Sequence, residues 1–238
     1  MIRTFLICAA LVFAVSTVAH AEPILQLYAE GATYDSTTES WVTDGPTFTL
    51  WVIGWVGWGG TIEDVRLSVA YEGTETMGIT FTPTTTDGLG GFTDPSTPSA
   101  PTYIQTVTDG SAPVLGDGSS LPPHGLFNQT GIHWQEYALG DFTLTDSPIG
   151  DFIDTFPSPS AGKFGQINAY EVAITGTATS VQIDVYDHIV GANNTWYKFA
   201  PFSHDAETGG TPVPEPGTLA LLGAGAIGLF LLRRRRGL

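Results

Sequence analysis

The chain has 238 residues, of which 42% are hydrophobic, with one cysteine and a formal net charge of −16. Residues 22–210 contain 23 acidic residues, no cysteine and only three basic residues, Arg66, Lys163 and Lys198. This charge argues against nucleic acids and anionic lipid head groups as partners, because both would repel the protein. The lack of cysteine excludes disulfides and a thiol nucleophile there, and the length allows one sizeable hydrophobic core.

Residues 1–21 have the organisation of a secretory signal peptide. Arg3 supplies a positive charge, residues 5–15 are apolar, and Ala19 and Ala21 place small residues where a signal peptidase cuts. The alternative is a retained transmembrane helix, but this apolar run falls well short of the ~20 residues that a spanning helix needs. We therefore predict cleavage after Ala21 and export of the remainder.

Strand signals dominate the exported part. In residues 181–185 apolar and polar side chains alternate, so that Gln182 and Asp184 are predicted to point outward. Gly, Pro, Asp and Asn separate the β-prone runs, and no convincing amphipathic helix is present. Strands are predicted at 24–28, 40–43, 47–56, 62–71, 79–81, 102–107, 134–144, 166–175, 181–186 and 195–199. The fold class is therefore all-β, with residues 22–206 forming a single antiparallel β-sandwich or jelly-roll-like ectodomain.

Two segments between the predicted strands have a different composition. Residues 83–125 are rich in Pro, Gly, Ser, Thr and Asp, which predicts a long surface excursion around the one short strand at 102–107. Residues 207–212 form a polar stretch of Gly, Thr and Pro, which predicts a linker between the ectodomain and the C-terminal segment.

The C-terminal segment, residues 213–238, consists of a helix breaker, an uncharged apolar run and a basic cluster. The breaker is Val213, Pro214, Glu215 and Pro216, and the basic cluster is Arg233, Arg234, Arg235 and Arg236. As a helix, residues 217–232 would span about 24 Å at ~1.5 Å per residue, and long arginine side chains extend such a span. Four arginines resist translocation, so we predict a transmembrane anchor helix with the arginines in the cytoplasm and the ectodomain outside.

These three parts, in this order at the C-terminus, resemble the PEP-CTERM sorting signal. The resemblance implies an envelope protein that an exosortase, a membrane cysteine transpeptidase, cuts near Pro214, Glu215 and Pro216. It also implies association with exopolysaccharide or biofilm export, and either retention at the membrane or release to the extracellular matrix. The alternative is a plain single-pass anchor.

Parts of the body resemble a second family, called choice-of-anchor N, in which one extracellular domain is joined to different anchoring tails. The resemblance lies in four short stretches, residues 26–28, 31–35, 137–142 and 198–205. It implies neither a known catalytic activity nor established functional residues.

The most aromatic stretch contains Trp51, Trp55 and Trp58 beside several glycines. One interpretation is a glycan-binding platform, for which Trp58 and Trp55 are the candidate residues, because exposed rings stack on sugar faces. The favoured interpretation is a central strand buried on both faces, because tryptophan is usually buried for the most part.

Several acidic residues are candidate ligands for Ca²⁺, a cation that prefers carboxylate and carbonyl oxygens. The main group is Asp184, Asp187 and Asp205, with Glu63 and Asp64, and Asp146, Asp151 and Asp154 form a second group. No EF-hand loop is present, and solvated acids in turns are the favoured interpretation. No other cofactor is indicated.

The sequence contains no recognisable catalytic motif. Histidines lack zinc-ligand spacing, no nucleophile elbow occurs, and no glycine-rich loop opens a helix. We therefore predict a non-enzymatic surface or matrix protein. A carbohydrate-binding module is the first alternative, and a glycan hydrolase with two carboxylates is the second, since only separation in space can identify such a pair.

Overall fold

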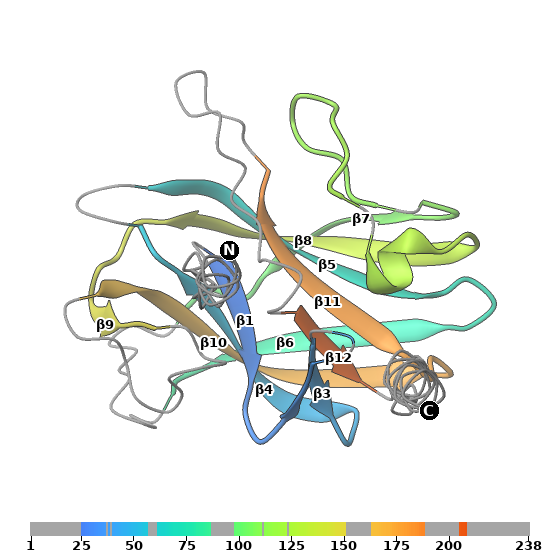
Figure 1. Ribbon diagram of the computed structural model, residues 1–238, viewed down its shortest axis with the longest axis horizontal. Coiled ribbons are helices and arrows are strands. Elements are labelled where there is room, and N and C mark those ends of the chain that lie inside the picture. Colours follow the sequence, from blue (N-terminus) through green and yellow to red (C-terminus); the bar gives the residue numbers. More distant parts are fainter. Residues whose placement is uncertain are drawn as a thin grey trace, which may run out of the picture.

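Strands make up almost all of the regular structure in the computed structural model (Figure 1). The structure describes residues 25–36, 38, 40–56, 61–86, 98–110, 112–122, 124–150, 163–188 and 205–208. The predicted signal peptide, the predicted strand at 195–199 and the whole C-terminal segment lie outside these ranges. Within them, no helix has the length and apolar character to cross a bilayer.

The described ranges contain twelve strands and one short 3₁₀ helix, η2 (Gly125–Asn128). The strands are β1 (Leu25–Ala29), β2 (Thr33–Asp35), β3 (Ser40–Thr43), β4 (Thr47–Gly54), β5 (Ile62–Glu72), β6 (Met77–Thr84), β7 (Thr102–Val107), β8 (Ile132–Phe142), β9 (Ser147–Pro148), β10 (Phe164–Gly176), β11 (Val181–Asp187) and β12 (Asp205–Thr208). The predicted all-β class is therefore confirmed.

The strands form two sheets. The five-stranded sheet has the order β1-β4-β10-β6, with β9 also paired to β10, and the seven-stranded sheet has the order β2-β3-β12-β11-β5-β8-β7. All pairs are antiparallel except β12 and β3, which run parallel. In Figure 1, β12 lies beside β3 at the lower part of the molecule.

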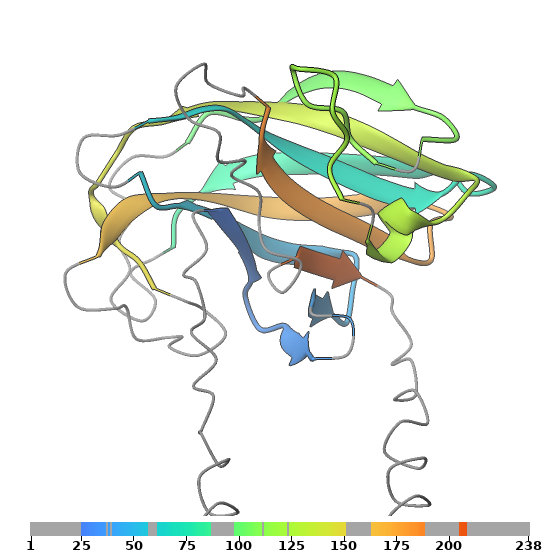
Figure 2. The same ribbon diagram turned by 45° about the horizontal axis from the view of Figure 1, so that its top comes forward.

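One apolar cluster contains residues from both sheets. Val52 and Val172 come from the five-stranded sheet, and Leu67 and Val185 come from the seven-stranded sheet. Figure 2 shows β5 and β8 above β10 and β4, so the cluster joins strands of two layers. Burial of this apolar surface is the main stabilising contribution to the fold.

Strand β4 is buried on both faces, as the favoured interpretation of the tryptophan-rich stretch predicts. Leu50 and Val52 lie on one face, Trp51 and Ile53 on the other, and all four are almost completely inaccessible. Trp51 contacts the ring of Tyr28 edge-on, and its Nε1 donates to Glu30 Oε1 at 2.6 Å. This ring is therefore part of the core.

Two boundaries differ from the prediction. Glu207 and Thr208, the first residues of the predicted linker, belong to β12, which pairs with both β11 and β3. A four-residue strand with distant partners carries too little local pattern to be recognised in a polar sequence. Similarly, the predicted excursion 83–125 begins inside β6, and its Leu115 and Leu121 are buried against the seven-stranded sheet.

We call residues 112–122 and 124–128 the cover segment, because they lie over the outer face of the seven-stranded sheet. Phe127 of η2 packs with Trp134 of β8, and Leu115 packs with Tyr186 of β11. Figure 2 shows η2 beside β11 and β5. The central strands of the seven-stranded sheet are thus covered on both faces.

Candidate functional site

The outer face of the seven-stranded sheet carries buried polar side chains on its three central strands. Ser68 of β5 lies opposite Glu136 of β8 and Asp184 of β11, so the three residues form one row across the sheet. Asp184 points outward, as the alternation in β11 predicts, yet it is only 3% exposed because the cover segment lies over it. Buried polar groups of this kind need partners, since each loses its hydrogen bonds to water.

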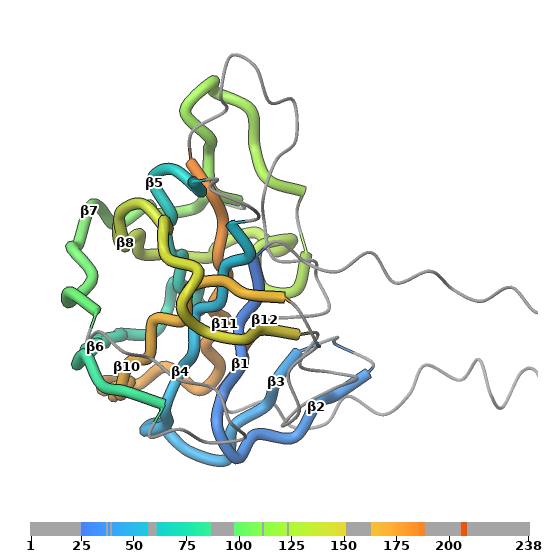
Figure 3. The backbone as a smooth tube through the Cα atoms, turned by 90° about the vertical axis from the view of Figure 1, so that its left-hand side faces the viewer, coloured from blue at the N-terminus to red at the C-terminus, as the bar shows by residue number. Residues whose placement is uncertain are grey.

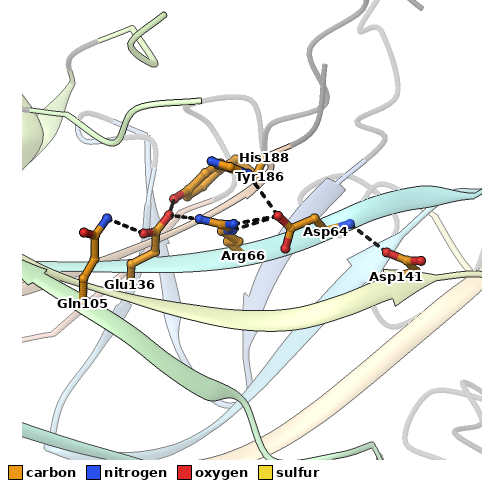
Figure 4. Close-up of polar contacts among 7 residues, drawn as sticks. All are labelled: Asp64, Arg66, Gln105, Glu136, Asp141, Tyr186 and His188. Atoms are coloured by element: carbon orange, nitrogen blue, oxygen red, sulfur yellow. Dashed lines mark hydrogen bonds and ion pairs between the residues drawn. The ribbon is translucent and has the colours of Figure 1, made fainter. Parts of the chain in front are cut away.

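Glu136 is the centre of an ionic network (Figure 4). Its side chain is 1% exposed, and its Oε1 accepts a hydrogen bond from Arg66 Nη1 at 2.9 Å and another from the Tyr186 hydroxyl. Its Oε2 accepts a hydrogen bond from Gln105 Nε2 at 2.7 Å. The network therefore joins β5, β7, β8 and β11.

Arg66 also binds Asp64, two residues earlier on β5. Its Nη2 and Nε donate to Asp64 Oδ2 at 2.7 and 3.2 Å, and His188 Nδ1 lies 3.0 Å from the same oxygen. The backbone N–H of Asp64 donates to Asp141 Oδ1 at 2.8 Å. The guanidinium thus lies between two carboxylates and donates to one oxygen of each.

The backbone of β5 is irregular at Asp64. Asp64 has φ of 48°, in the left-handed region, and the β5–β8 register shifts on both sides of Val65. A bulge of this kind re-aims a side chain and is retained where surrounding contacts fix it.

Burial and charge set the protonation states in the network. Burial alone would raise the pKa of Asp64, but hydrogen bonds and charge from Arg66, with a smaller contribution from His188, hold this pKa below its ordinary value. Burial first, and then the Glu136 carboxylate, raise the pKa of Tyr186 well above its ordinary value. Tyr186 therefore stays protonated, and its hydroxyl donates a hydrogen bond to Glu136.

A second polar contact ties the cover segment to β11. His124 Nε2 lies 2.8 Å from Asp184 Oδ2, and Gln182 Oε1 accepts the backbone N–H of Leu126 at 2.6 Å. Gly125 has φ of 48°, and a Cβ there would lie 2.1 Å from Gln182 Oε1, so only glycine fits this approach. The backbone N–H of Gly116 also donates to the carbonyl oxygen of His188.

The chemistry of this site is mutual neutralisation. Glu136 and Asp64 share the charge of Arg66, and Tyr186 and Gln105 satisfy the remaining positions on Glu136. Breaking a buried ion pair leaves an unpaired buried charge, so loss of any one partner from this network is destabilising.

The structure does not bring Asp184 and Asp187 together. They are three positions apart on β11, whose register to β5 is uninterrupted, so they lie on opposite faces of the sheet. Asp205 begins β12, and its side chain lies outside what the structure describes, as do Asp151 and Asp154. In the described part of the chain, no group of three His, Cys, Asp or Glu residues is placed to hold a metal ion. The Ca²⁺ site remains a prediction.

The two candidate glycan-binding rings have different outcomes. Trp55 is half-buried, and Lys163 Nζ lies 5.6 Å from its ring centroid, so a cation occupies one face. Trp58 lies outside the described residues. Glycan binding by these rings remains a prediction.

Sequence reasoning did not single out Glu136, Tyr186, Gln105 or His188, the partners that complete the network. A usable signal was present in Arg66, one of three basic residues in positions 22–210, which occupies an outward position in a long β-prone run. A cation there indicates an acidic partner on a neighbouring strand, but the sequence does not say which of 23 acids it is.

Comparison with known proteins identifies the C-terminal segment. The family model of the PEP-CTERM protein-sorting motif matches residues 212–236. This match contains Val213, Pro214, Glu215, Pro216 and the arginine cluster, and it supports the sorting signal predicted there. The motif indicates an exported protein that is processed by an exosortase. The resemblance of the body to the choice-of-anchor N family is not confirmed.

The remaining comparisons concern the whole chain. No curated protein matches it. Among the solved structures that match is the "Streptococcus agalactiae AgI/II polypeptide BspA C terminal domain (WT)", at 11% identity and a TM-score of 0.20, covering 78% of this chain and 48% of that one. A chain described as "BspA_C_WT" matches at 12% identity with the same TM-score and coverage. This chain spans about half the length of these structures, and TM-scores of this size carry no argument about its fold.

Proposed function

We propose that the chain is a non-enzymatic surface or extracellular-matrix protein. Its β-sandwich ectodomain is displayed outside the cytoplasm, held at the cell envelope by the C-terminal segment until an exosortase processes that segment, and associated with exopolysaccharide. Signal peptidase and exosortase are the processing partners.

The observation that carries this proposal is the position of the sorting motif relative to the fold. The motif begins at residue 212, and the last described strand, β12, ends at Thr208. Because β12 lies between β3 and β11, the folded domain continues almost to the sorting signal. An export signal that directly follows a folded domain makes that domain the cargo.

The short connection also limits where the domain is held. The eight residues from 209 to 216 span at most about 29 Å when fully extended. Before processing, the ectodomain is therefore held close to the bilayer surface. After a cut near Pro214–Pro216, the whole of β12 stays with the ectodomain.

The non-enzymatic part of the proposal is supported by the ionic network. Its ionisable groups bind one another across four strands, and Glu136 at the centre is 1% exposed. A general acid or base must reach a substrate proton within hydrogen-bonding distance, and this carboxylate is covered by its partners.

Deletion of residues 213–238 tests the tethering. In cells that produce neither exosortase nor exopolysaccharide, fractionation is expected to place the full chain in the envelope, and the deletion is expected to release it. Retention of the truncated protein in the envelope would contradict the proposal. Replacing Arg233–Arg236 by lysine, which keeps the charge, is the matched control and is expected to preserve retention.

The processing step has its own test. Combined replacement of Pro214, Glu215 and Pro216 by alanine is expected to leave the protein at the precursor mass on a gel, because the sorting motif is removed while the apolar run remains. Processing at the unchanged rate would show that another sequence directs the cut. In a strain that produces no exopolysaccharide, the processed protein is expected to leave the cell surface; undiminished retention would contradict the association.

A further inference from the structure

Strand β7 forms a free edge of the seven-stranded sheet. It pairs with β8 on one side, and on its other side no strand of the described part of the chain follows it. Figure 3 shows β7 at the outer side of the molecule. An edge strand presents backbone N–H and C=O groups that can pair with another chain.

The sequence of β7 lacks the usual protection of such an edge. None of its six residues, Thr-Tyr-Ile-Gln-Thr-Val, is charged or is proline, although the surrounding domain is strongly acidic. The other edges differ, because β2 is three residues long and ends in Asp35, β6 contains Pro83, and β1, although uncharged, is buried along its whole length. Natural edge strands are protected by charges, prolines, short length or β-bulges, and of these features β7 has only a bulge, between Tyr103 and Gln105.

Two of the five exposed large hydrophobic residues in the described ranges lie on this one strand. Tyr103 is 54% exposed and Ile104 is 38% exposed. The ring of Tyr103 packs edge-on against Tyr137 at 5.7 Å between centroids, and its hydroxyl lies 2.9 Å from Thr106 Oγ1. The tyrosine is therefore held in place while much of its surface faces solvent. A side chain that is already fixed loses little conformational entropy when a partner binds it.

We propose that two copies of this chain pair edge to edge through β7, in antiparallel orientation around a two-fold axis between Ile104 and Gln105. The partner is a second copy because the strand is self-complementary in this register. Thr102 lies opposite Val107 of the second copy, and Tyr103 lies opposite Thr106. Such a contact is isologous and closes on itself.

Charge supports this choice of partner. Two copies repel each other over most of their surface, since residues 22–210 carry a net charge of −20. Around the axis between Ile104 and Gln105, however, Asp109 lies opposite Ala100 of the second copy, so no acid faces an acid. The uncharged strand therefore brings no like charges into the contact itself.

The bulge in β7 is compatible with the pairing. The β7–β8 register shifts between Tyr103 and Gln105, so Ile104 is the extra residue that falls outside the ladder. Ile104 therefore has no residue opposite it on β8. A second copy would supply polar partners at the axis.

The size of the contact predicts its strength. Six residues at ~3.3 Å each extend over about 20 Å, and a single strand pair buries less than the ~1,200 Å² of a stable interface. The pairing is therefore weak for isolated molecules and grows with local concentration. This inference goes beyond the proposed function and does not depend on it.

Disulfide trapping in the purified full-length chain tests the pairing. In Ile104→Cys, the two cysteines of a pair lie beside the axis, where Cα atoms approach within the ~4.4–6.8 Å that a disulfide spans. Mild oxidation at high protein concentration is expected to convert most of this variant to a covalent dimer on a non-reducing gel. High salt is expected to increase the yield, because it screens the repulsion.

Two controls make the result specific. Leu144→Cys has the same 38% exposure and lies away from β7, so it is expected to stay monomeric. In the proposed register, residue 102 of one copy lies far from residue 102 of the other and opposite residue 107. Thr102→Cys is therefore expected to dimerise only when mixed with Val107→Cys. The unmodified chain, whose single cysteine is Cys8, gives the background.

The pairing is overturned if Ile104→Cys stays monomeric, or if it cross-links no more than Leu144→Cys. Efficient dimerisation of Thr102→Cys alone would overturn the register. Because the assay uses purified protein, its failure leaves export and sorting unaffected, and a failure of sorting leaves the assay unaffected.

Discussion

At its central strands the seven-stranded sheet is buried on both faces, but the two faces differ in chemistry. The inner face presents Leu67 and Ile183 to the shared apolar cluster, whereas the outer face combines apolar packing against the cover segment with the buried carboxylates of Glu136 and Asp184. Apolar contacts are non-directional, so the stability of the inner face depends on how well its side chains fill the space between the sheets. The ionic contacts require each partner in place, because one missing group leaves a buried charge.

The comparison shows that burial has two origins in this sheet. Inner residues are buried because the second sheet packs on them, and the alternation of the strands encodes this directly. Outer residues are buried in part because a segment between β7 and β8 folds back over them, and in part, as at Glu136, because their own polar partners cover them. The network should therefore be sensitive to loss of a single partner, and the core to loss of volume.

The largest expected effect comes from Glu136→Ala, which leaves Arg66 with Asp64 alone and removes the acceptor of Tyr186. The expected loss is about 3–5 kcal/mol of the free energy of unfolding, the usual cost of breaking a buried ion pair from one side. Urea unfolding of the full chain measures it, with the exposed Glu171→Ala on β10 as control, expected within about 0.5 kcal/mol of wild type.

The inner face supplies the benchmark for this result. Leu67→Ala, at the position between the outward-facing Arg66 and Ser68, is expected to lose about 2–5 kcal/mol by creating a cavity. If Glu136→Ala instead costs no more than the Glu171 control, the outer network does not contribute to folding, and the proposed difference between the faces is wrong.

The next effect is a pH dependence from Asp64. Its pKa is lower in the folded state than the ordinary 3.8, because Arg66 and His188 outweigh the effect of burial. Stability from this group is therefore fully present above its ordinary pKa, and it is lost as the pH falls through the lower folded value. Asp64→Asn is expected to remove this component, so wild type and variant should converge in stability on acidification.

Urea unfolding at a series of acidic pH values measures this difference. Because the Asp64 side chain is 25% exposed, solvent screening reduces the effect below that of a fully buried pair. Glu171→Gln, at an exposed site, is the control. A constant gap between wild type and Asp64→Asn at all pH values would contradict the assignment.

The smallest effect is expected at Ser68, between Glu136 and Asp184 in the same row. Its hydroxyl is fully buried and has no hydrogen-bond partner among the described residues. Ser68→Ala should therefore leave stability within about 1 kcal/mol of wild type, on the stabilising side, since an unpaired buried hydroxyl is removed. A loss well above this value would show that the hydroxyl has a partner.

Sequence patterns predicted the longer elements well, because their signals are local. The runs that became β4, β5, β10 and β11 are long, β-branched and aromatic, and their ends were placed within two residues. The short strands β2, β9 and β12 were missed, because two to four residues carry little intrinsic preference and are fixed by distant partners.

The candidate site could be predicted only in part. Alternation identified Asp184 as outward-facing, but not that His124, sixty residues earlier in the chain, would lie against it. Arg66 and Glu136 are 70 residues apart, and their contact depends on the pairing of β5 with β8. Register between distant strands is set by the whole pattern of packing and not by either strand alone.

The sequence by itself determined the all-β class and the sorting motif, because strand alternation and a breaker–apolar–basic tail act through neighbouring residues. Only the tertiary structure decided which of the many acids pair with Arg66, and that β12 completes the seven-stranded sheet directly before the motif. The reason is physical: local preference and hydropathy are properties of short segments, whereas ion pairing and strand insertion depend on groups that meet only after the chain has folded.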